Sequence, residues 1–204
     1  SVYEMIDYTP AEKPLPNTQV KAAIKTGIKA ERPEWRIGYQ WRYAWIGPAG
    51  KGTFTQELIG EDNLESMPVW VIRSGKNENL FDKNMLGLVA VRSGEKWVSK
   101  RSAPFQLLSW PLETGKEWKI NYVLEQVQEK SSRTIDARIV VANVEEITLS
   151  AGTFETFKIE VYDNYARKLS SEHWYSPKVK WFVKNKTYLA NSVREEELLS
   201  FKSD

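Results

Sequence analysis

Residues 151–184 decide the fold of this chain, and they read AGTFETFKIEVYDNYARKLSSEHWYSPKVKWFVK. Two runs inside this stretch alternate between apolar and polar side chains. The apolar members are Phe157, Ile159 and Val161 in the first run and Val179, Trp181 and Val183 in the second. A period of two places each apolar set on one face of a β-strand, with the polar set on the other. The stretch therefore predicts antiparallel strands with one face toward a core and one toward water.

The same alternation continues outward along the rest of the chain. Four large aromatic residues share one face of the strand that precedes the turn at residues 47–52: Tyr39, Trp41, Tyr43 and Trp45. Further strands are expected at residues 53–61, 69–73, 80–81, 86–92, 96–100, 118–124, 138–149, 187–194 and 197–201. This spacing predicts a mainly β fold, a strongly curved antiparallel sheet of about ten strands. We expect a half-barrel or open barrel, because closing or curling the sheet protects its edges.

The first 33 residues follow a different pattern. Residues 1–17 hold three prolines and show no periodicity, so we expect an extended tether. Residues 18–31 place apolar side chains at helical spacing and lysines along another face, with Asn17 or Thr18 as a cap and Pro33 as the end. This predicts one short helix that docks on the sheet, or alternatively a basic amphipathic helix on a membrane surface. Residues 18–204 then form a single β domain.

Composition narrows the classes of function. The 204 residues carry a formal net charge of +2, and 41% of them are hydrophobic, as in an ordinary soluble domain. A charge this small gives no bulk attraction to nucleic acid. A basic stripe with one aromatic residue resembles a nucleic-acid platform; its members are Lys178, Lys180, Phe182, Lys184 and Lys186. We interpret the stripe as a solvent face that discourages edge pairing, and we expect no nucleic-acid partner.

Three segments of the chain resemble a known group of proteins. They are PLETGKEW at 111–118, AGTFETFKIEV at 151–161 and HWYSPKVKWFVK at 173–184. Together they are similar to a group of uncharacterised bacterial envelope proteins and lipoproteins. The resemblance implies a curved antiparallel sheet around a helix, similar to the half-barrel of the periplasmic lipoprotein carriers. One position departs from the pattern, since Lys180 stands where the group usually has glycine.

The candidate catalytic residues are few. His173 is the only histidine, with Ser170 and Ser171 nearby in sequence and Asp163 on the preceding strand. No G-x-S-x-G nucleophile elbow is present. With one histidine and no cysteine, a zinc site lacks ligands. Adjacent carboxylates such as Glu145-Glu146 point to opposite faces of a strand, so we interpret them as solvated charge. We therefore expect no enzyme, no metal and no cofactor, and we expect His173 not to be a catalyst.

The resulting hypothesis is a non-enzymatic protein of the bacterial envelope, periplasmic or attached to the outer membrane. Its concave sheet would bind an apolar ligand, namely a lipid, an acyl chain or a lipoprotein segment. The predicted ligand-binding residues are Tyr39, Trp41, Tyr43, Trp45, Trp118, Phe157, Ile159 and Trp181. The alternative is a structural or assembly scaffold of the envelope whose core is filled by its own side chains, with another envelope protein as its partner. A chain that begins at Ser1 fits a removed signal peptide or a membrane tether upstream.

Overall fold

The computed structural model describes residues 19–22 and 27–203, which form fifteen β-strands and, within those ranges, no helix. The predicted tether at residues 1–17 lies outside the described residues. The first eight strands are β1 (Gln19–Ala22), β2 (Lys29–Ala30), β3 (Gln40–Gly47), β4 (Gly50–Leu64), β5 (Met67–Ser74), β6 (Asn77–Asp82), β7 (Leu88–Ser93) and β8 (Lys96–Phe105). The others are β9 (Leu112–Glu113), β10 (Glu117–Gln126), β11 (Ser131–Leu149), β12 (Gly152–Asp163), β13 (Lys168–Ser176), β14 (Trp181–Tyr188) and β15 (Val193–Lys202).

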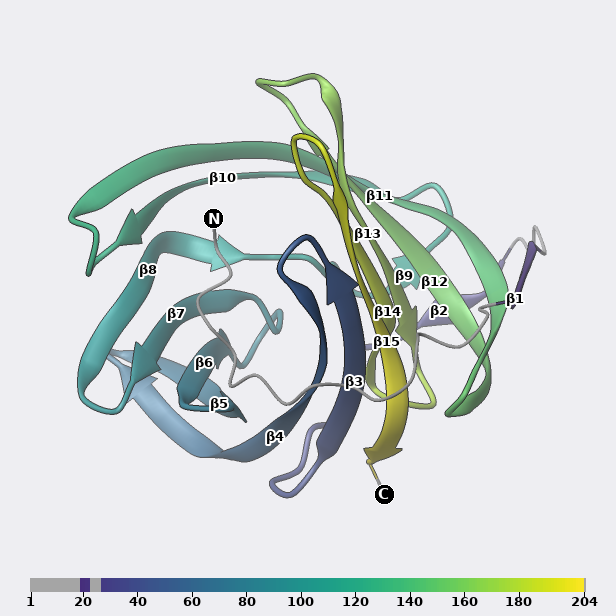
Figure 1. Ribbon diagram of the computed structural model, residues 1–204, viewed down its shortest axis with the longest axis horizontal. Coiled ribbons are helices and arrows are strands. Elements are labelled where there is room, and N and C mark those ends of the chain that lie inside the picture. Colours follow the sequence, from purple (N-terminus) through teal and green to yellow (C-terminus); the bar gives the residue numbers. More distant parts are fainter. Residues whose placement is uncertain (1–18, 23–26, 204) are drawn as a thin grey trace.

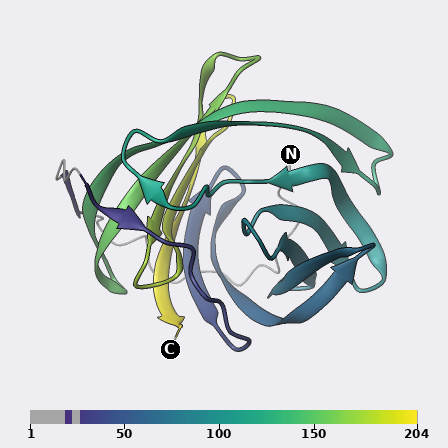
Figure 2. The same ribbon diagram turned by 180° about the vertical axis from the view of Figure 1, so that it is seen from behind.

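The strands form one closed antiparallel ring (Figure 1). The order is β11-β10-β8-β7-β6-β5-β4-β3-β15-β14-β13-β12, and β12 pairs back onto β11. The thirteen-stranded sheet less β1 therefore gives a ring of twelve strands. β2 and β9 form a separate two-stranded sheet on the side of the molecule that faces the viewer in Figure 2. The predicted mainly β fold class and the predicted antiparallel pairing of the strands are confirmed.

The expectation of a ten-strand half-barrel was wrong, because the ring closes. The closure depends on the long strand β11, whose first part (131–140) pairs with β10 along one edge and whose later part (137–149) pairs with β12 along the other. In the closed ring each of the twelve strands has a hydrogen-bonded neighbour on both sides, which protects most of the strand edges. The join between β8 and β10 is the narrowest in the ring and has only three residue pairs, Leu124↔Arg101, Glu125↔Lys100 and Gln126↔Ser99.

The predicted helix at residues 18–31 was also wrong wherever the structure describes it. Gln19–Ala22 is strand β1, which adds to β11 beside Glu145–Thr148. Gly27 has a φ of +82°, which no helix accommodates, and Lys29–Ala30 is strand β2. Beyond Val140, the edge of β11 that faces away from β12 is not covered by β10 and offers backbone hydrogen bonds to β1. This tertiary pairing outweighs a weak helical pattern. Thr18 and residues 23–26 lie outside the described residues.

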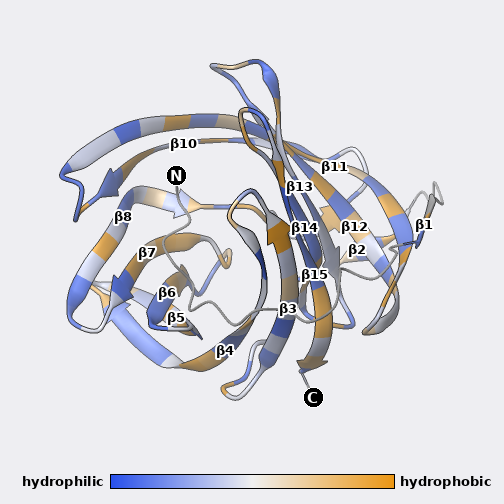
Figure 3. Ribbon diagram, in the orientation of Figure 1, coloured by the Kyte–Doolittle hydropathy of each residue, from blue (hydrophilic) through white to orange (hydrophobic). Residues whose placement is uncertain are grey.

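The predicted alternation is confirmed along β10 and β12, where hydrophobic and hydrophilic residues succeed one another (Figure 3). In β12, Phe157, Ile159 and Val161 are buried, while Lys158 and Glu160 between them are partly exposed. In β10, Trp118 is half-buried and the next three alternate positions are buried. These residues belong to or pack against one large core inside the ring.

β14 departs from simple alternation, since Trp181, Phe182, Val183 and Lys184 are all buried. The register explains this, because Tyr175 pairs with Phe182 while the preceding Trp174 pairs with Lys184. Val183 is thus the extra residue of a β-bulge, which reverses the faces on either side of it.

The predicted solvent-facing lysine stripe was wrong at two of its positions. The Lys184 ammonium is buried 2.9 Å from Glu197, on a strand paired on both sides rather than at an edge. Lys180, which stands where the resembling group has glycine, has a φ of +59°. This left-handed conformation favours glycine. The Lys180 Nζ atom donates to the Tyr39 hydroxyl at 2.8 Å and to the Ser203 carbonyl at 2.9 Å.

Candidate functional site

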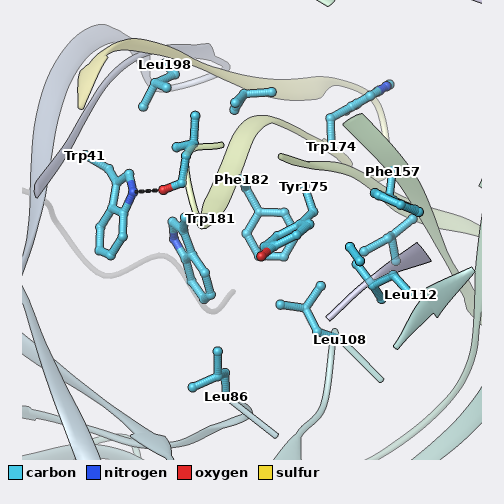
Figure 4. Close-up of a cluster of buried hydrophobic side chains, with 14 of the residues drawn as sticks. Trp41, Leu86, Leu108, Leu112, Phe157, Trp174, Tyr175, Trp181, Phe182 and Leu198 are labelled. Carbon is cyan, nitrogen blue, oxygen red and sulfur yellow. Dashed lines mark hydrogen bonds between the residues drawn. The ribbon is translucent and has the colours of Figure 1, made fainter. Parts of the chain in front are cut away.

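The predicted ligand-binding aromatics lie mainly inside a packed cluster. Trp41 is 0% exposed, and its indole N–H donates to the Val179 carbonyl at 3.0 Å (Figure 4). Its ring lies 6.0 Å from Trp35, 6.3 Å from Tyr39 and 5.9 Å from Trp181. Ring pairs at these separations are typical of a solid aromatic core. The expected burial of Trp41 and Trp181 is confirmed, and the space between them is filled by other rings.

The remaining predicted residues are also held by intramolecular contacts. The Tyr43 hydroxyl donates to the Phe182 carbonyl at 2.7 Å. The Trp118 indole donates to the Gln106 carbonyl at 2.9 Å, and the Trp118 side chain is half-buried. The other three residues of the predicted set, Trp45, Phe157 and Ile159, are buried in the same core. Their role in ligand binding stays a prediction.

A pocket of about 420 Å³ opens elsewhere in the ring, beside the narrow join of β8 and β10. Its walls come from five consecutive strands, β10 to β14, and from β8. The residues that line it are Arg101, Phe105, Ile120, Tyr122, Arg133, Thr134, Ile135, Asp136, Ala137, Val161, Asp163, Tyr165, Ser170, Ser171, His173, Thr187, Tyr188 and Leu189. This volume falls within the range of about 300–1,000 Å³ that is usual for small-molecule sites.

A smaller pocket of about 170 Å³ adjoins the first, since Phe105 and His173 line both. Two of the predicted aromatics, Tyr43 and Trp181, are part of its wall. The structure thus places Tyr43 and Trp181 of the predicted site beside a pocket. The other predicted ligand-binding residues line neither of these two pockets.

A chain of polar side chains crosses the wall between the two pockets. His173 Nε2 lies 2.9 Å from Ser171 Oγ, and His173 Nδ1 lies 2.9 Å from Asn185 Oδ1. Because Asn185 Oδ1 only accepts, Nδ1 carries the proton and Nε2 accepts from the serine hydroxyl. Asn185 in turn donates through Nδ2 to Glu196 at 3.2 Å. Burial lowers the pKa of His173 to about 4, so the imidazole is neutral near pH 7.

This serine–histidine–amide order resembles a nucleophilic triad, although the surroundings do not complete one. Ser171 lies between Val161 of β12 and Thr187 of β14, so its backbone is engaged in the sheet on both sides. An oxyanion hole requires backbone N–H groups that point at the oxygen of the reacting carbonyl. Backbone N–H groups that are hydrogen-bonded within a sheet cannot do so. Asp163 does not contact the histidine and instead accepts the Ala166 amide at 2.8 Å. The arrangement can fix the imidazole and present neutral polar groups to a ligand.

Arg101 is the functional candidate that sequence reasoning missed. It pairs across the β8–β10 join with Leu124, which is 1% exposed, so both side chains face the interior. Its Nε and Nη1 atoms are buried and have no hydrogen-bond partner. Burial lowers the pKa of Arg101 and raises the pKa of the neighbouring Tyr122. A signal existed, because Arg101 lies four residues before Phe105 on the same strand, and even spacing on a strand favours a shared face.

Two hairpins, the β12–β13 and β14–β15 turns, project on the same side of the molecule (Figure 1), and each contributes a residue to the rim of the pocket. Tyr165, at the tip of the first turn, is 68% exposed, and Leu189, in the second, is 37% exposed. Both residues line the pocket. The mouth therefore carries exposed apolar side chains, whereas the deeper wall carries Arg101, Ser171 and His173.

In the described ranges, no group of three or more histidine, cysteine or carboxylate residues is placed to hold a metal ion. The same residues include no helix long and apolar enough to cross a membrane.

The fold and the pocket define an antiparallel β-barrel with an open, partly polar pocket in its wall. No protein-family model and no curated protein matches the sequence. The chain is similar at low identity to several solved structures, among them three that are described as lipoproteins or exported proteins. A protein of Parabacteroides distasonis assigned as a lipoprotein is 12% identical with a TM-score of 0.40, covering 85% of this chain and 99% of its own.

The second structure is a Bacteroides fragilis protein assigned as exported, with a YmcC-like fold. It is 14% identical with a TM-score of 0.46, and the match covers 85% of this chain and 100% of the other. The third is the hypothetical lipoprotein YmcC of Escherichia coli, 12% identical with a TM-score of 0.46, covering 80% and 88%. Identities and TM-scores this low carry no information about function, so the function of this chain has to be argued from its own residues.

Proposed function

We propose that this protein is a non-enzymatic ligand-binding barrel of the bacterial cell envelope. Its ligand is an apolar or amphiphilic molecule, such as a lipid or an acyl chain, that enters the 420 Å³ pocket beside β8 and β10. The observation that carries the proposal is the pocket itself, because the side chains inside the ring do not fill this space. Open apolar walls with a few polar groups are typical of small-molecule sites. The envelope location rests on the sequence motifs at residues 111–118, 151–161 and 173–184.

The walls suit an apolar guest. Phe105, Ile120 and Val161 contribute apolar surface inside the pocket, and Leu189 continues it to the mouth. An apolar ligand removes this surface from water, which stabilises the complex by about 25 cal/mol for each Å² buried. The neutral Ser171–His173 pair adds hydrogen bonds without adding charge.

The proposal differs from the sequence-based hypothesis in the position of the site. The aromatic row that includes Trp41 packs against other rings, so it supports the pocket from behind rather than lining it. That packing favours the scaffold alternative for one half of the ring. We keep this alternative as the second candidate, with an envelope protein as the partner.

Ligand titration with a pocket-filling variant tests the proposal. Ala137 is 4% exposed and lines the pocket, so Ala137→Phe places a ring in the open space. Ala49, in the exposed β3–β4 turn, is the matched control as Ala49→Phe. We expect saturable binding of a fluorescent fatty-acid analogue by the wild type and by Ala49→Phe, and at least a tenfold loss for Ala137→Phe. Native mass spectrometry of the purified protein should also reveal a copurified amphiphile. Absence of saturable binding across several lipid classes contradicts the proposal and leaves the scaffold function.

A further inference from the structure

The pocket contains a positive charge that no acidic side chain of the described residues balances. Arg101 faces the interior of the ring beside Leu124, at the three-pair join of β8 and β10. Its Nε and Nη1 atoms are shielded from water and make no hydrogen bond. Transfer of a charged group out of water is costly unless the charge is paired and hydrogen-bonded. The neighbouring Tyr122 hydroxyl hydrogen-bonds to Arg101 but is a neutral phenol, so Nε and Nη1 remain available to an anion.

Arginines elsewhere on the same sheet show the usual solution. Arg92 lies 2.7 Å from Glu78 and 2.8 Å from Asp62, and Arg138 lies 3.2 Å from Glu117. These arginines are on the outer, wetter parts of the molecule, where pairing matters less. The more deeply placed Arg101 has no such ion pair among the described residues.

The two carboxylates of the pocket wall are held at its mouth instead. Asp136 accepts a hydrogen bond from the Asn164 amide at 2.6 Å, and Asp163 accepts the Ala166 backbone N–H at 2.8 Å. Both therefore stabilise the β12–β13 turn. The polar groups deeper in the pocket, Ser171 and His173, are neutral near pH 7. They can donate or accept hydrogen bonds but supply no negative charge.

We infer that Arg101 binds the anionic head of an amphiphile whose apolar tail lies along Phe105, Ile120 and Val161. The inference rests on the proposed function and names the ligand class, which is a single alkyl or acyl chain with one oxyanion head. The planar guanidinium forms a fork of N–H donors that matches a carboxylate or phosphate in a bidentate manner. The exposed Tyr165 and Leu189 at the mouth extend the apolar surface along which the tail leaves the pocket.

The experiment compares ligands that separate the head from the tail. Decanoate carries a carboxylate head, decyl phosphate carries a phosphoryl head, decanol carries the tail alone, and inorganic phosphate carries the anion alone. Each is titrated into the wild type by calorimetry. We expect decanoate or decyl phosphate to bind at least tenfold more tightly than decanol, and inorganic phosphate to bind weakly. The better of the two anionic heads identifies whether the natural head is a carboxylate or a phosphate.

Variants of Arg101 then assign the effect to this residue. Arg101→Met should weaken binding of the preferred anionic ligand by about 10- to 100-fold, as loss of a charged hydrogen bond does, and leave decanol within about twofold. Arg101→Lys should retain part of the affinity, because it keeps the charge without the fork. Lys100→Met is the matched control, since the ammonium of Lys100 lies 4.7 Å above the Trp97 ring and Lys100 does not line the 420 Å³ pocket. The control should bind like the wild type.

Three outcomes overturn the inference. If Arg101→Met binds the anionic ligand as tightly as the wild type, Arg101 is not the recognition residue, although the pocket still binds apolar tails. If inorganic phosphate binds as well as decyl phosphate, the site takes a plain anion rather than an amphiphile. If none of the alkyl ligands binds the wild type, the proposed function fails together with the inference. Should Arg101→Met not fold, Arg101→Lys and the ligand series on the wild type give the same decision.

Discussion

The only histidine should make the stability of this protein depend on pH in a window where few other side chains titrate. Burial lowers the pKa of His173 from 6.5 to about 4, against an opposing effect of the Asn185 hydrogen bond and the Glu172 charge. In the unfolded chain the imidazole binds a proton below about pH 6.5, whereas in the folded chain it binds one only near pH 4. The unfolded state thus holds more protons between these values. Lowering the pH through this window must reduce the free energy of unfolding.

The magnitude follows from the size of the shift. One pKa unit corresponds to about 1.36 kcal/mol of unfolding free energy. Most of the change in the free energy of unfolding falls between pH 6.5 and pH 4, the two pKa values of His173. Between pH 7.5 and pH 4.5, the linkage relation gives a loss of about 2.5 kcal/mol from this one group. Such a loss is a large share of the free energy of unfolding of a folded domain, which is usually about 5–15 kcal/mol.

Urea unfolding followed by tryptophan fluorescence measures this effect at a series of pH values between 7.5 and 4.5. The matched variant is His173→Gln, which keeps an amide donor and acceptor near Ser171 and Asn185 but does not titrate. Carboxylates with lowered pKa values, such as Glu57 and Asp62, also lose stability in acid, but they do so in both proteins. The difference between the two pH profiles therefore isolates His173. Parallel profiles for the two proteins would refute the reasoning.

Further outcomes concern stability at neutral pH, measured by urea unfolding. Trp41→Ala should cost about 3–5 kcal/mol, because it empties a fully buried site and removes the indole hydrogen bond to Val179; a loss under about 1 kcal/mol contradicts the packing. Asp82→Ala should cost roughly 2–4 kcal/mol, since its carboxylate accepts three backbone N–H groups at 2.7–3.0 Å. Lys180→Gly should be more stable than Lys180→Ala by about 0.5–1 kcal/mol, because φ is +59° there; equal stabilities would argue against a left-handed residue. Arg101→Met should stabilise the ligand-free protein by about 1–3 kcal/mol, and destabilisation would mean that the charge is already balanced.

The strands could be predicted because their information is local. On β10 and β12 the period of two follows directly from which residues are apolar, and the structure buries those residues. Closure of the ring could not be predicted in this way. It depends on β11 being long enough to pair with β10 through its first part (131–140) and with β12 through its later part (137–149). The identity of a strand's pairing partners leaves no periodic pattern in its own sequence. The helix expected at residues 18–31 failed for a similar reason, since the unpaired length of β11 decided the conformation of Gln19–Ala22.

The site was harder to predict than the fold. Large aromatic side chains such as Trp41 and Trp181 attract attention, but their size also lets them fill space, and here they pack on each other 5.9 Å apart. Ser171 and His173 were named as neighbours in the sequence, and the structure does place them in contact. Asn185 and Arg101 come from other strands, so their contribution depends on the order of strands in the ring.

The binding and scaffold hypotheses now apply to different halves of the same ring. Around Trp41 the rings of neighbouring residues exclude any guest, as a self-filled scaffold requires. At the β8–β10 join, only three residue pairs connect the strands, and the wall opens into the larger pocket. The packed half supports the wall of the open half, because β13 and β14 contribute residues to both the core and the pocket. Arg101 lies at this join, so an anion bound there would also strengthen the connection that has the fewest residue pairs in the ring. Ligand binding should therefore raise the stability of the wild type and leave Arg101→Met nearly unchanged, which links the two halves in one measurement.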